Sequence, residues 1–479
     1  MKCHYWVSTA VLAGVLCFTV RPHQGAVNNS ATNTNAIPDT CSIPLSNSDA
    51  WLKQMQQGDE LYSSGKYDEA TVEYMGAVEK GGPTAEHNLC LAIRLGNLAR
   101  AYSTRGQYVR ALPISRLSIH IFEVATTDDD PGLATHLNQL GDLYLKLGRF
   151  GDAEPLYRRA LKILSANSPR RTDLLATKTN YATLCYDTAR YAEAESLFNG
   201  VLNESQELLG STHPGVANAM NNLGTVYVAE GRYSEAELLY KRSLKIAQTN
   251  PATKAVDLAI ALSNLGLLYN KVARFGSAEG ALHKALDIQE RELGPEHPAT
   301  ALTMINLANA CANLGHYQDA ENLYVRGMHT TEKAVGPNHP QYALALTNLA
   351  GLYALQHRFN EAETLFEKAL TTCERTLGQD HPDTAVVLNN LAVVNFWQRR
   401  YPEANVGFKR SLAILESTLG TNHPQVAKVK LKYAVLLRAM KRNAEAKQLE
   451  ASAKEVLATQ AEQDASKSVV DVQQLKHNN

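Results

Sequence analysis

Apolar and small residues recur in this chain at three- and four-residue steps, the spacing that places them on one face of an α-helix. The stretch from Val216 to Tyr227 has this pattern, and a second such stretch runs from Ser234 to Ala247. Gly231 lies in the short break between them. We therefore expect a helix, a tight turn and a second helix in this part of the chain.

The same pair of helices returns at a fixed period. Each second helix is marked by a turn, a basic or polar residue, an aromatic ring and an alanine three residues after the ring, as in Gly231-Arg232-Tyr233 with Ala236. Self-similarity at about 20–50 residues predicts a stacked-repeat protein in which each unit buries its apolar face against its neighbours. The ring recurs at steps of 41 or 42 residues, at Tyr67, Tyr108, Phe150, Tyr191, Tyr233, Phe275, Tyr317, Phe359 and Tyr401, and a tenth unit has Asn443 there.

A hexapeptide joins one unit to the next. It reads Leu-Gly-Pro-Glu-His-Pro from Leu293 to Pro298, and related hexapeptides begin at Leu377 and Leu419. A glycine just past a helix can take the left-handed conformation that closes it. Proline at the first position of the next helix lacks an N–H that would have no partner there in any case. We therefore expect each first helix to begin at the proline of this connector.

These residues resemble the tetratricopeptide repeat (TPR), and the 42-residue unit with its connector resembles the kinesin light chain variety of that repeat. The resemblance covers about Asp49 to Leu457 and implies an all-α fold, a right-handed α-solenoid (superhelix) of about ten helix-turn-helix units. Residues 26–48 lack the heptad coiled coil of a true light chain, so we expect no motor role. The residues that support the resemblance are Gly224, Ala236 and Ser243, with Leu223, Tyr227 and Tyr240 between them.

The ends of the chain differ from the repeats. Residues 1–25 have a basic start and an apolar run too short to span a membrane, which predicts a signal peptide and export to the periplasm or the medium. The chain is cytoplasmic if this segment is not a signal, and any membrane contact is expected through it alone. We expect residues 26–48 to form a flexible linker, residues 49–460 the solenoid and residues 461–479 a polar disordered tail.

Composition narrows the function. The formal net charge of −1 disfavours nucleic acid as a partner. The sequence contains no Gly-x-Ser-x-Gly, no phosphate-binding loop and no His-Glu-x-x-His, so we predict no enzyme, no cofactor and no small-molecule substrate. Cys185 and Cys311 occupy the repeat position of Tyr227, which predicts that they fill the core as small apolar side chains.

Two further residue types recur with the repeat. The connector histidines lie one to a unit, about a helix diameter apart, so neighbours cannot share a zinc ion. We predict a local role for them at the helix start and no metal. The glutamates Glu193, Glu235 and Glu361 open second helices, where a negative charge complements the helix dipole. The histidines are His213, His297, His339, His381 and His423.

An asparagine recurs just before the Leu-Gly or Leu-Ala of the first helices. First helices line the concave face of TPR superhelices, and this position resembles the asparagine ladder that some members use to hold an extended peptide. A carboxamide offers a donor and an acceptor, so a row of them can pair with successive backbone amides. Alternatively, each asparagine bonds to the neighbouring repeat and fixes the stacking. The series is Asn97, Asn180, Asn222, Asn264, Asn306, Asn348 and Asn390.

The last units add a candidate basic and aromatic pocket, in which Arg438 and nearby lysines lie beside Trp397. Together these features predict a scaffold that holds an extended segment of a partner protein along its asparagine-lined face. The alternative is a purely architectural repeat module that joins an assembly through its outer face.

Overall fold

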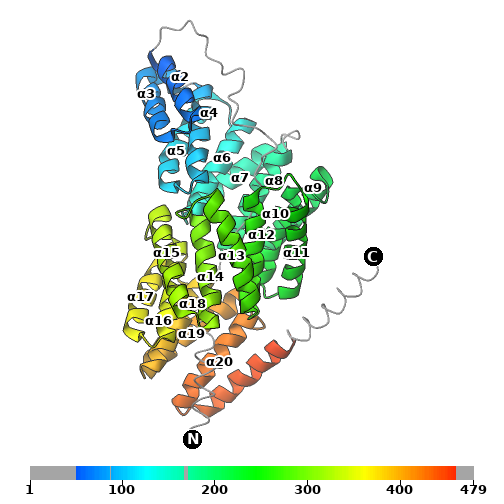
Figure 1. Ribbon diagram of the computed structural model, residues 1–479, viewed down its shortest axis with the longest axis vertical. Helices are drawn as coiled ribbons and strands as arrows, with labels where there is room; N and C mark the ends of the chain where they lie inside the picture. The colour runs from blue at the N-terminus through cyan, green and yellow to red at the C-terminus, as the bar shows by residue number, and fades with distance from the viewer. Residues whose placement is uncertain (1–49, 87, 167–170, 460–479) are drawn as a thin grey trace. The chain divides into compact units, whose positions relative to one another are not determined.

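The computed structural model describes residues 50–86, 88–166 and 171–459 (Figure 1). All regular structure in these residues is helical. The chain divides into two units. Within the described residues, the N-terminal unit comprises 50–184 and 203–208, and the C-terminal unit comprises 185–202 and 209–459.

Within the described residues, the N-terminal unit contains six whole helices and parts of two others, whose remaining residues belong to the C-terminal unit. Its helices are α2 (Ala50–Ser63), α3 (Tyr67–Glu86), α4 (Leu89–Thr104), α5 (Tyr108–Ala125), α6 (Pro131–Lys146), α7 (Phe150–Ala166) and α8 (Arg171–Asp187), followed by α9 (Tyr191–Leu209).

The C-terminal unit continues the same alternation. Its helices are α10 (Pro214–Ala229), α11 (Tyr233–Thr249), α12 (Ala255–Lys271), α13 (Phe275–Glu292), α14 (Pro298–Leu314), α15 (Tyr317–Val335), α16 (Pro340–Leu355), α17 (Phe359–Thr376), α18 (Pro382–Trp397), α19 (Tyr401–Leu419), α20 (Pro424–Ala439) and a last helix over 443–459. Even-numbered helices are the first helices of their repeats, and odd-numbered helices are the second.

The predicted repeat register is confirmed. Every aromatic residue of the 41- or 42-residue series is the first residue of a second helix, from Tyr67 in α3 to Tyr401 in α19. Connector prolines open α14, α18 and α20 as predicted, and also α10 and α16. Gly294 and Gly378 have φ of 90° and 99°, the left-handed conformation expected after a helix. These local signals therefore fix the helix ends.

Small residues let the two helices of a repeat approach closely. Gly224 of α10 packs against the ring of Tyr240 in α11, where an added Cβ would lie 2.7 Å from Cε1. Gly141 and Tyr157 make the equivalent contact between α6 and α7. The small and aromatic positions of the repeat are thus complementary surfaces of one helical hairpin.

First and second helices are buried to different extents in the C-terminal unit. In α14 every residue from Thr300 to Ala312 is buried, and α16 and α18 are similar. In α15 only Ala320, Tyr324, Gly327, Thr331 and Val335 are buried, which form one stripe. The first helices therefore form the buried layer of this unit, and the second helices have one side exposed.

The predicted signal, linker and tail lie outside the described residues, as do residues 49 and 460 at the ends of the predicted solenoid. No helix in the described part of the chain is long and apolar enough to cross a membrane.

Candidate functional site

The predicted asparagine ladder lies on the first helices. Asn222, Asn264, Asn306, Asn348 and Asn390 come from α10, α12, α14, α16 and α18 of the C-terminal unit, and each is at most 1% exposed. In the N-terminal unit Asn97 on α4 is also buried and Asn180 on α8 is half-buried. Recurrence at one repeat position thus places the same side chain in the buried layer of successive repeats.

The two ladder residues of the N-terminal unit bond to protein side chains. Asn180 Nδ2 donates a hydrogen bond to Asn138 Oδ1 on α6 at 3.1 Å, across one repeat boundary. Asn97 Oδ1 accepts from Arg100 one helical turn later, at 2.9 Å. The first of these bonds is of the type that the stacking alternative predicts.

Carboxamides in the C-terminal unit are less well satisfied. Among the described residues, neither Nδ2 nor Oδ1 of Asn306 has a hydrogen-bond partner, and the same is true of Asn221 on α10. Asn389 Nδ2 donates to Asn390 Oδ1 at 2.9 Å, but Asn389 Oδ1 has no partner. A buried polar atom without a partner costs about 1–3 kcal/mol. These carboxamides are therefore not explained by stability.

Other residues connect α12 to α14. Asn270 Nδ2 donates to the main-chain carbonyl of Asn306 at 2.9 Å, and the hydroxyls of Ser263 and Thr303 lie 2.8 Å apart. Stacking at this boundary thus uses the backbone of Asn306 and leaves its side-chain amide unused.

The predicted basic and aromatic pocket has a different arrangement from the one expected. The indole of Trp397 stacks on the ring of Phe359, with centroids 6.3 Å apart. Arg438 lies at the exposed end of α20 and donates two hydrogen bonds to Glu450, at 2.8 and 2.7 Å. Because the guanidinium of Arg438 already binds the carboxylate of Glu450, it is poorly placed to bind the carboxylate of a ligand.

The connector histidines cap first helices, as predicted. In each of them Nδ1 accepts a hydrogen bond from the backbone N–H two residues later, at 3.0–3.1 Å. His423 Nε2 also lies 2.8 Å from the carbonyl oxygen of Ala229 at the end of α10. Burial lowers the pKa of His423 to about 4. A neutral ring with Nδ1 accepting and Nε2–H donating satisfies both contacts.

Sequence reasoning missed a role of the arginines before the second helices, which we call the turn arginines. Arg232 lies 3.7 Å from the ring centroid of Tyr227 and 2.7 Å from Glu195 in the second helix of the preceding repeat. Arg358 repeats this arrangement with Tyr353 and Glu321. The predicted glutamates at the helix starts add to it, since Glu235 also binds Arg232. The turn arginines are Arg232, Arg274, Arg358 and Arg400, each with a glutamate 37 residues earlier.

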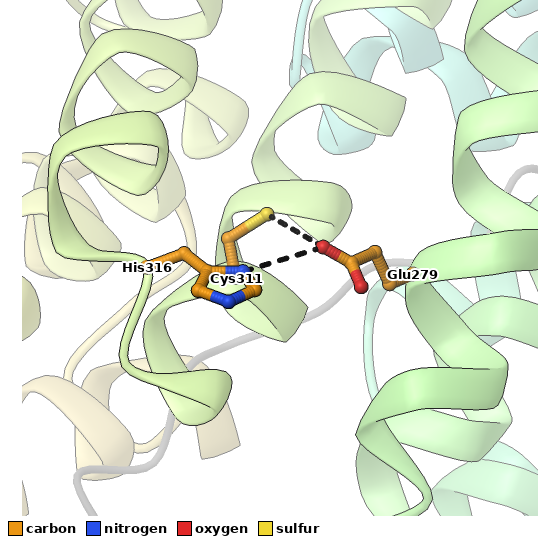
Figure 2. A group of neighbouring side chains, drawn as sticks. All are labelled: Glu279, Cys311 and His316. Carbon is orange, nitrogen blue, oxygen red and sulfur yellow. Dashed lines mark hydrogen bonds and ion pairs between the residues drawn. The ribbon is translucent and has the colours of Figure 1, made fainter.

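One turn departs from this arrangement. Between α14 and α15 the arginine is replaced by His316 and the tyrosine by Cys311, while Glu279 on α13 keeps the glutamate position. Figure 2 shows the three side chains pointing toward one another. His316 Nδ1 and Cys311 Sγ lie 3.5 and 3.8 Å from the same oxygen of Glu279. The repeat pattern predicted Cys311 only as a core residue, whereas the replacement of both the tyrosine and the arginine at one turn is the signal in the sequence that indicates a different role.

The other cysteines are placed differently. Cys185 and Cys373 are buried thiols outside any disulfide, and Cys185 fills the core as predicted. Cys90 is disulfide-bonded. Disulfides persist mainly in oxidising compartments, and export stays a proposal.

The fold and the buried polar layer together define an α-helical repeat solenoid. A family model for the tetratricopeptide repeat matches residues 89–166, 173–249, 257–328, 330–375, 341–405 and 383–458. The chain belongs to the tetratricopeptide repeat family, whose members are generally non-enzymatic protein-interaction scaffolds.

Each of the individual relatives matches only part of this chain. Nephrocystin-3 from Mus musculus is 37% identical over 75 residues, which are 16% of this chain and 6% of that protein. A Rap protein complexed with competence and sporulation factor aligns with a TM-score of 0.50 and 13% identity, covering 69% of this chain and 99% of that one. At 13% identity the likeness to the Rap protein shows the fold alone.

Putative kinesin light chain TPR-like repeats from Podosopora anserina align with a TM-score of 0.34 and 23% identity, over 43% of this chain and 97% of that chain. An alignment at this TM-score adds nothing to the fold assignment. The resemblance to this variety of repeat continues to rest on the 42-residue unit and its connector.

Proposed function

We propose that this protein binds an extended segment of a partner protein through buried asparagine side chains on the first helices of its C-terminal unit. We call these side chains the carboxamide row, and they are the ladder residues Asn222, Asn264, Asn306, Asn348 and Asn390 together with Asn221 and Asn389. The observation behind this proposal is the set of buried side-chain amides without partners in the described residues, above all Asn306 and Asn221. Each offers one acceptor and two donors, and a peptide backbone supplies the complementary groups at every residue. A bound segment would therefore offset a cost that the unbound protein bears.

The chemistry of the row favours a ligand read by its backbone. Buried polar residues on the same helices include Asn218, Thr225 and Asn309, which are uncharged, and the carboxylate of Asp257 lies against Asn218. Amides and hydroxyls contribute no strong preference for a charged side chain. The Rap protein with the same fold was solved in complex with a factor, which agrees with a binding role for such repeats.

Burial of the row sets a condition on binding. Because Asn306 is 0% exposed, a segment reaches it only when neighbouring first helices separate. First helices of adjacent repeats pack less extensively against each other than each packs against its own second helix, and the repeat boundary is held mainly by α13 on α14. Separation along this boundary leaves the hairpins intact, so we expect binding to be coupled to an opening of the solenoid.

The test uses a displayed library of random peptides selected on the full chain. We expect selected peptides to bind wild type and Asn322→Ala equally, since Asn322 is an exposed asparagine on α15. The variant with both Asn221→Ala and Asn306→Ala should bind them roughly 10–100-fold more weakly, because each lost hydrogen bond contributes about 0.5–1.5 kcal/mol.

Two further measurements separate the proposal from its alternative. Methylation of successive backbone nitrogens in a selected peptide should weaken binding more than alanine substitution of its side chains. Peptides whose affinity is unchanged by the double substitution would overturn the proposal. A double variant that unfolds earlier but binds normally would instead assign the carboxamides to stacking, and the outer face would become the candidate interface.

A further inference from the structure

The turn between α14 and α15 lacks the arginine–tyrosine contact of the neighbouring turns and contains side chains that can bind a metal ion. At the other turns of the C-terminal unit that keep a turn arginine and its tyrosine, the guanidinium joins two repeats by contacting the ring and a glutamate. Neither Cys311 nor His316 can make the cation–π contact of such an arginine. Together with Glu279 they supply one sulfur, one nitrogen and one oxygen ligand.

The positions of these atoms suit a tetrahedral ion. Zinc bonds of about 2.0–2.3 Å at tetrahedral angles place ligand atoms about 3.3–3.7 Å apart. The observed separations from the Glu279 oxygen are 3.5 Å for His316 Nδ1 and 3.8 Å for Cys311 Sγ. All three ligand atoms lie within 4.8 Å of one another. Small side-chain movements therefore bring them to bonding distance of one point.

The surroundings provide an entry path and a rigid base. The His316 side chain is 52% exposed and Glu279 is 28% exposed, whereas Cys311 is only 3% exposed. An ion can thus reach the imidazole and carboxylate from solvent and contact the buried thiol last. The three residues come from α13, from α14 and from the turn before α15, so an ion would join one repeat to the next (Figure 2).

The donor set selects the metal. A thiolate, an imidazole and a carboxylate are the ligand types of zinc, and the soft sulfur disfavours magnesium and calcium. Burial, together with the charges of Glu279 and Asp319, raises the pKa of the Cys311 thiol to about 11. A divalent cation reverses this effect, because the thiol loses its proton when it coordinates.

We propose that Glu279, Cys311 and His316 form a zinc site that joins neighbouring repeats in place of the tyrosine, arginine and glutamate of the other turns. The fourth position is open to water or to Asp319, which occupies the repeat position of Glu235 and Glu361. This site is independent of the carboxamide row.

Cobalt is the probe, because thiolate coordination to Co²⁺ gives a charge-transfer absorption in the near ultraviolet. We expect the untagged full chain, stripped with a chelator, to take up one equivalent of Co²⁺ with this absorption, and Zn²⁺ to abolish it. The variant Cys311→Ser should lose the absorption. Cys185→Ser should keep it, since Cys185 has the same repeat position but is followed by Arg190 at the turn.

A second variant distinguishes loss of the metal site from loss of folding. Cys311→Tyr with His316→Arg rebuilds the pair found at the neighbouring turns, and it should retain the wild-type helix content while losing cobalt binding. Zinc should raise the Tm of wild type and leave that of this variant unchanged. The proposal is overturned if wild type gives no thiolate absorption with cobalt, or if the absorption persists in the double variant.

Discussion

The first and second helices of the C-terminal unit differ in how much of each helix is buried and in which residue types are buried. In α15 the buried residues follow a three- and four-residue spacing and the rest face solvent, as the sequence pattern predicts for a surface helix. In α14 burial extends around the whole helix and includes Thr300, Thr303, Asn306 and Asn309. A polar side chain in such a position weakens the core unless it is bonded. Both kinds of helix contribute apolar core residues, but the first helices also contain buried asparagines, such as Asn306, that stability does not explain.

The largest expected loss of stability comes from a substitution in the buried stripe of a second helix. Tyr324 of α15 is 0% exposed, and its hydroxyl donates a hydrogen bond to Asn309 Oδ1 at 2.6 Å. Tyr324→Ala should lower the free energy of unfolding by about 3–5 kcal/mol, because it leaves a cavity and an unpaired carboxamide oxygen. Chemical denaturation followed by circular dichroism measures this. The exposed Gln318→Ala on the same helix is the control, and an equal loss in both variants would contradict the assignment.

A second prediction concerns the start of a first helix. The folded-state pKa of His423 is about 4, below the 6.5 of an unperturbed histidine. Its contribution to stability is therefore complete above about pH 6.5 and is lost as the pH falls toward 4. At 1.36 kcal/mol per pKa unit, the full loss is about 3 kcal/mol.

Denaturation midpoints measured from pH 7 to pH 4 test this prediction. His423→Asn keeps a side chain that can cap a helix but does not titrate, so its stability should change less over this range. Parallel curves for wild type and this variant would show that His423 is not responsible for the acid sensitivity.

The smallest expected effect concerns the turn between the two kinds of helix. Arg232 contacts Tyr227 and the carboxylates of Glu195 and Glu235. Arg232→Ala should lower the free energy of unfolding by about 1 kcal/mol, the size expected for a partly exposed ion-pair network with a cation–π contact. Arg291→Ala is the control, since Arg291 is 66% exposed and pairs only with its neighbour Glu292 among the described contacts. The difference between the two should shrink in high salt if it is electrostatic.

Local features were predictable because local chemistry produces them. An aromatic residue after a polar turn begins each second helix, and a connector proline begins a first helix, since both signals act within a few residues. The histidines were predicted at helix starts, where their rings accept backbone hydrogen bonds. The contact of His423 with Ala229 was not predictable, because it joins residues 194 positions apart. Such contacts depend on how successive repeats are rotated, which no single repeat encodes.

The candidate sites divide in the same way. The sequence by itself determined the period of the asparagines and the helix that contains each of them, because both follow from the repeat register. Only the tertiary structure decided that Asn306 is buried without a side-chain partner while Asn180 bonds across a repeat boundary. It also decided that Cys311 meets His316 and Glu279, since the glutamate lies one repeat earlier. Hydrogen bonds and ligand sets require atoms within a few ångströms, and stacking sets those distances.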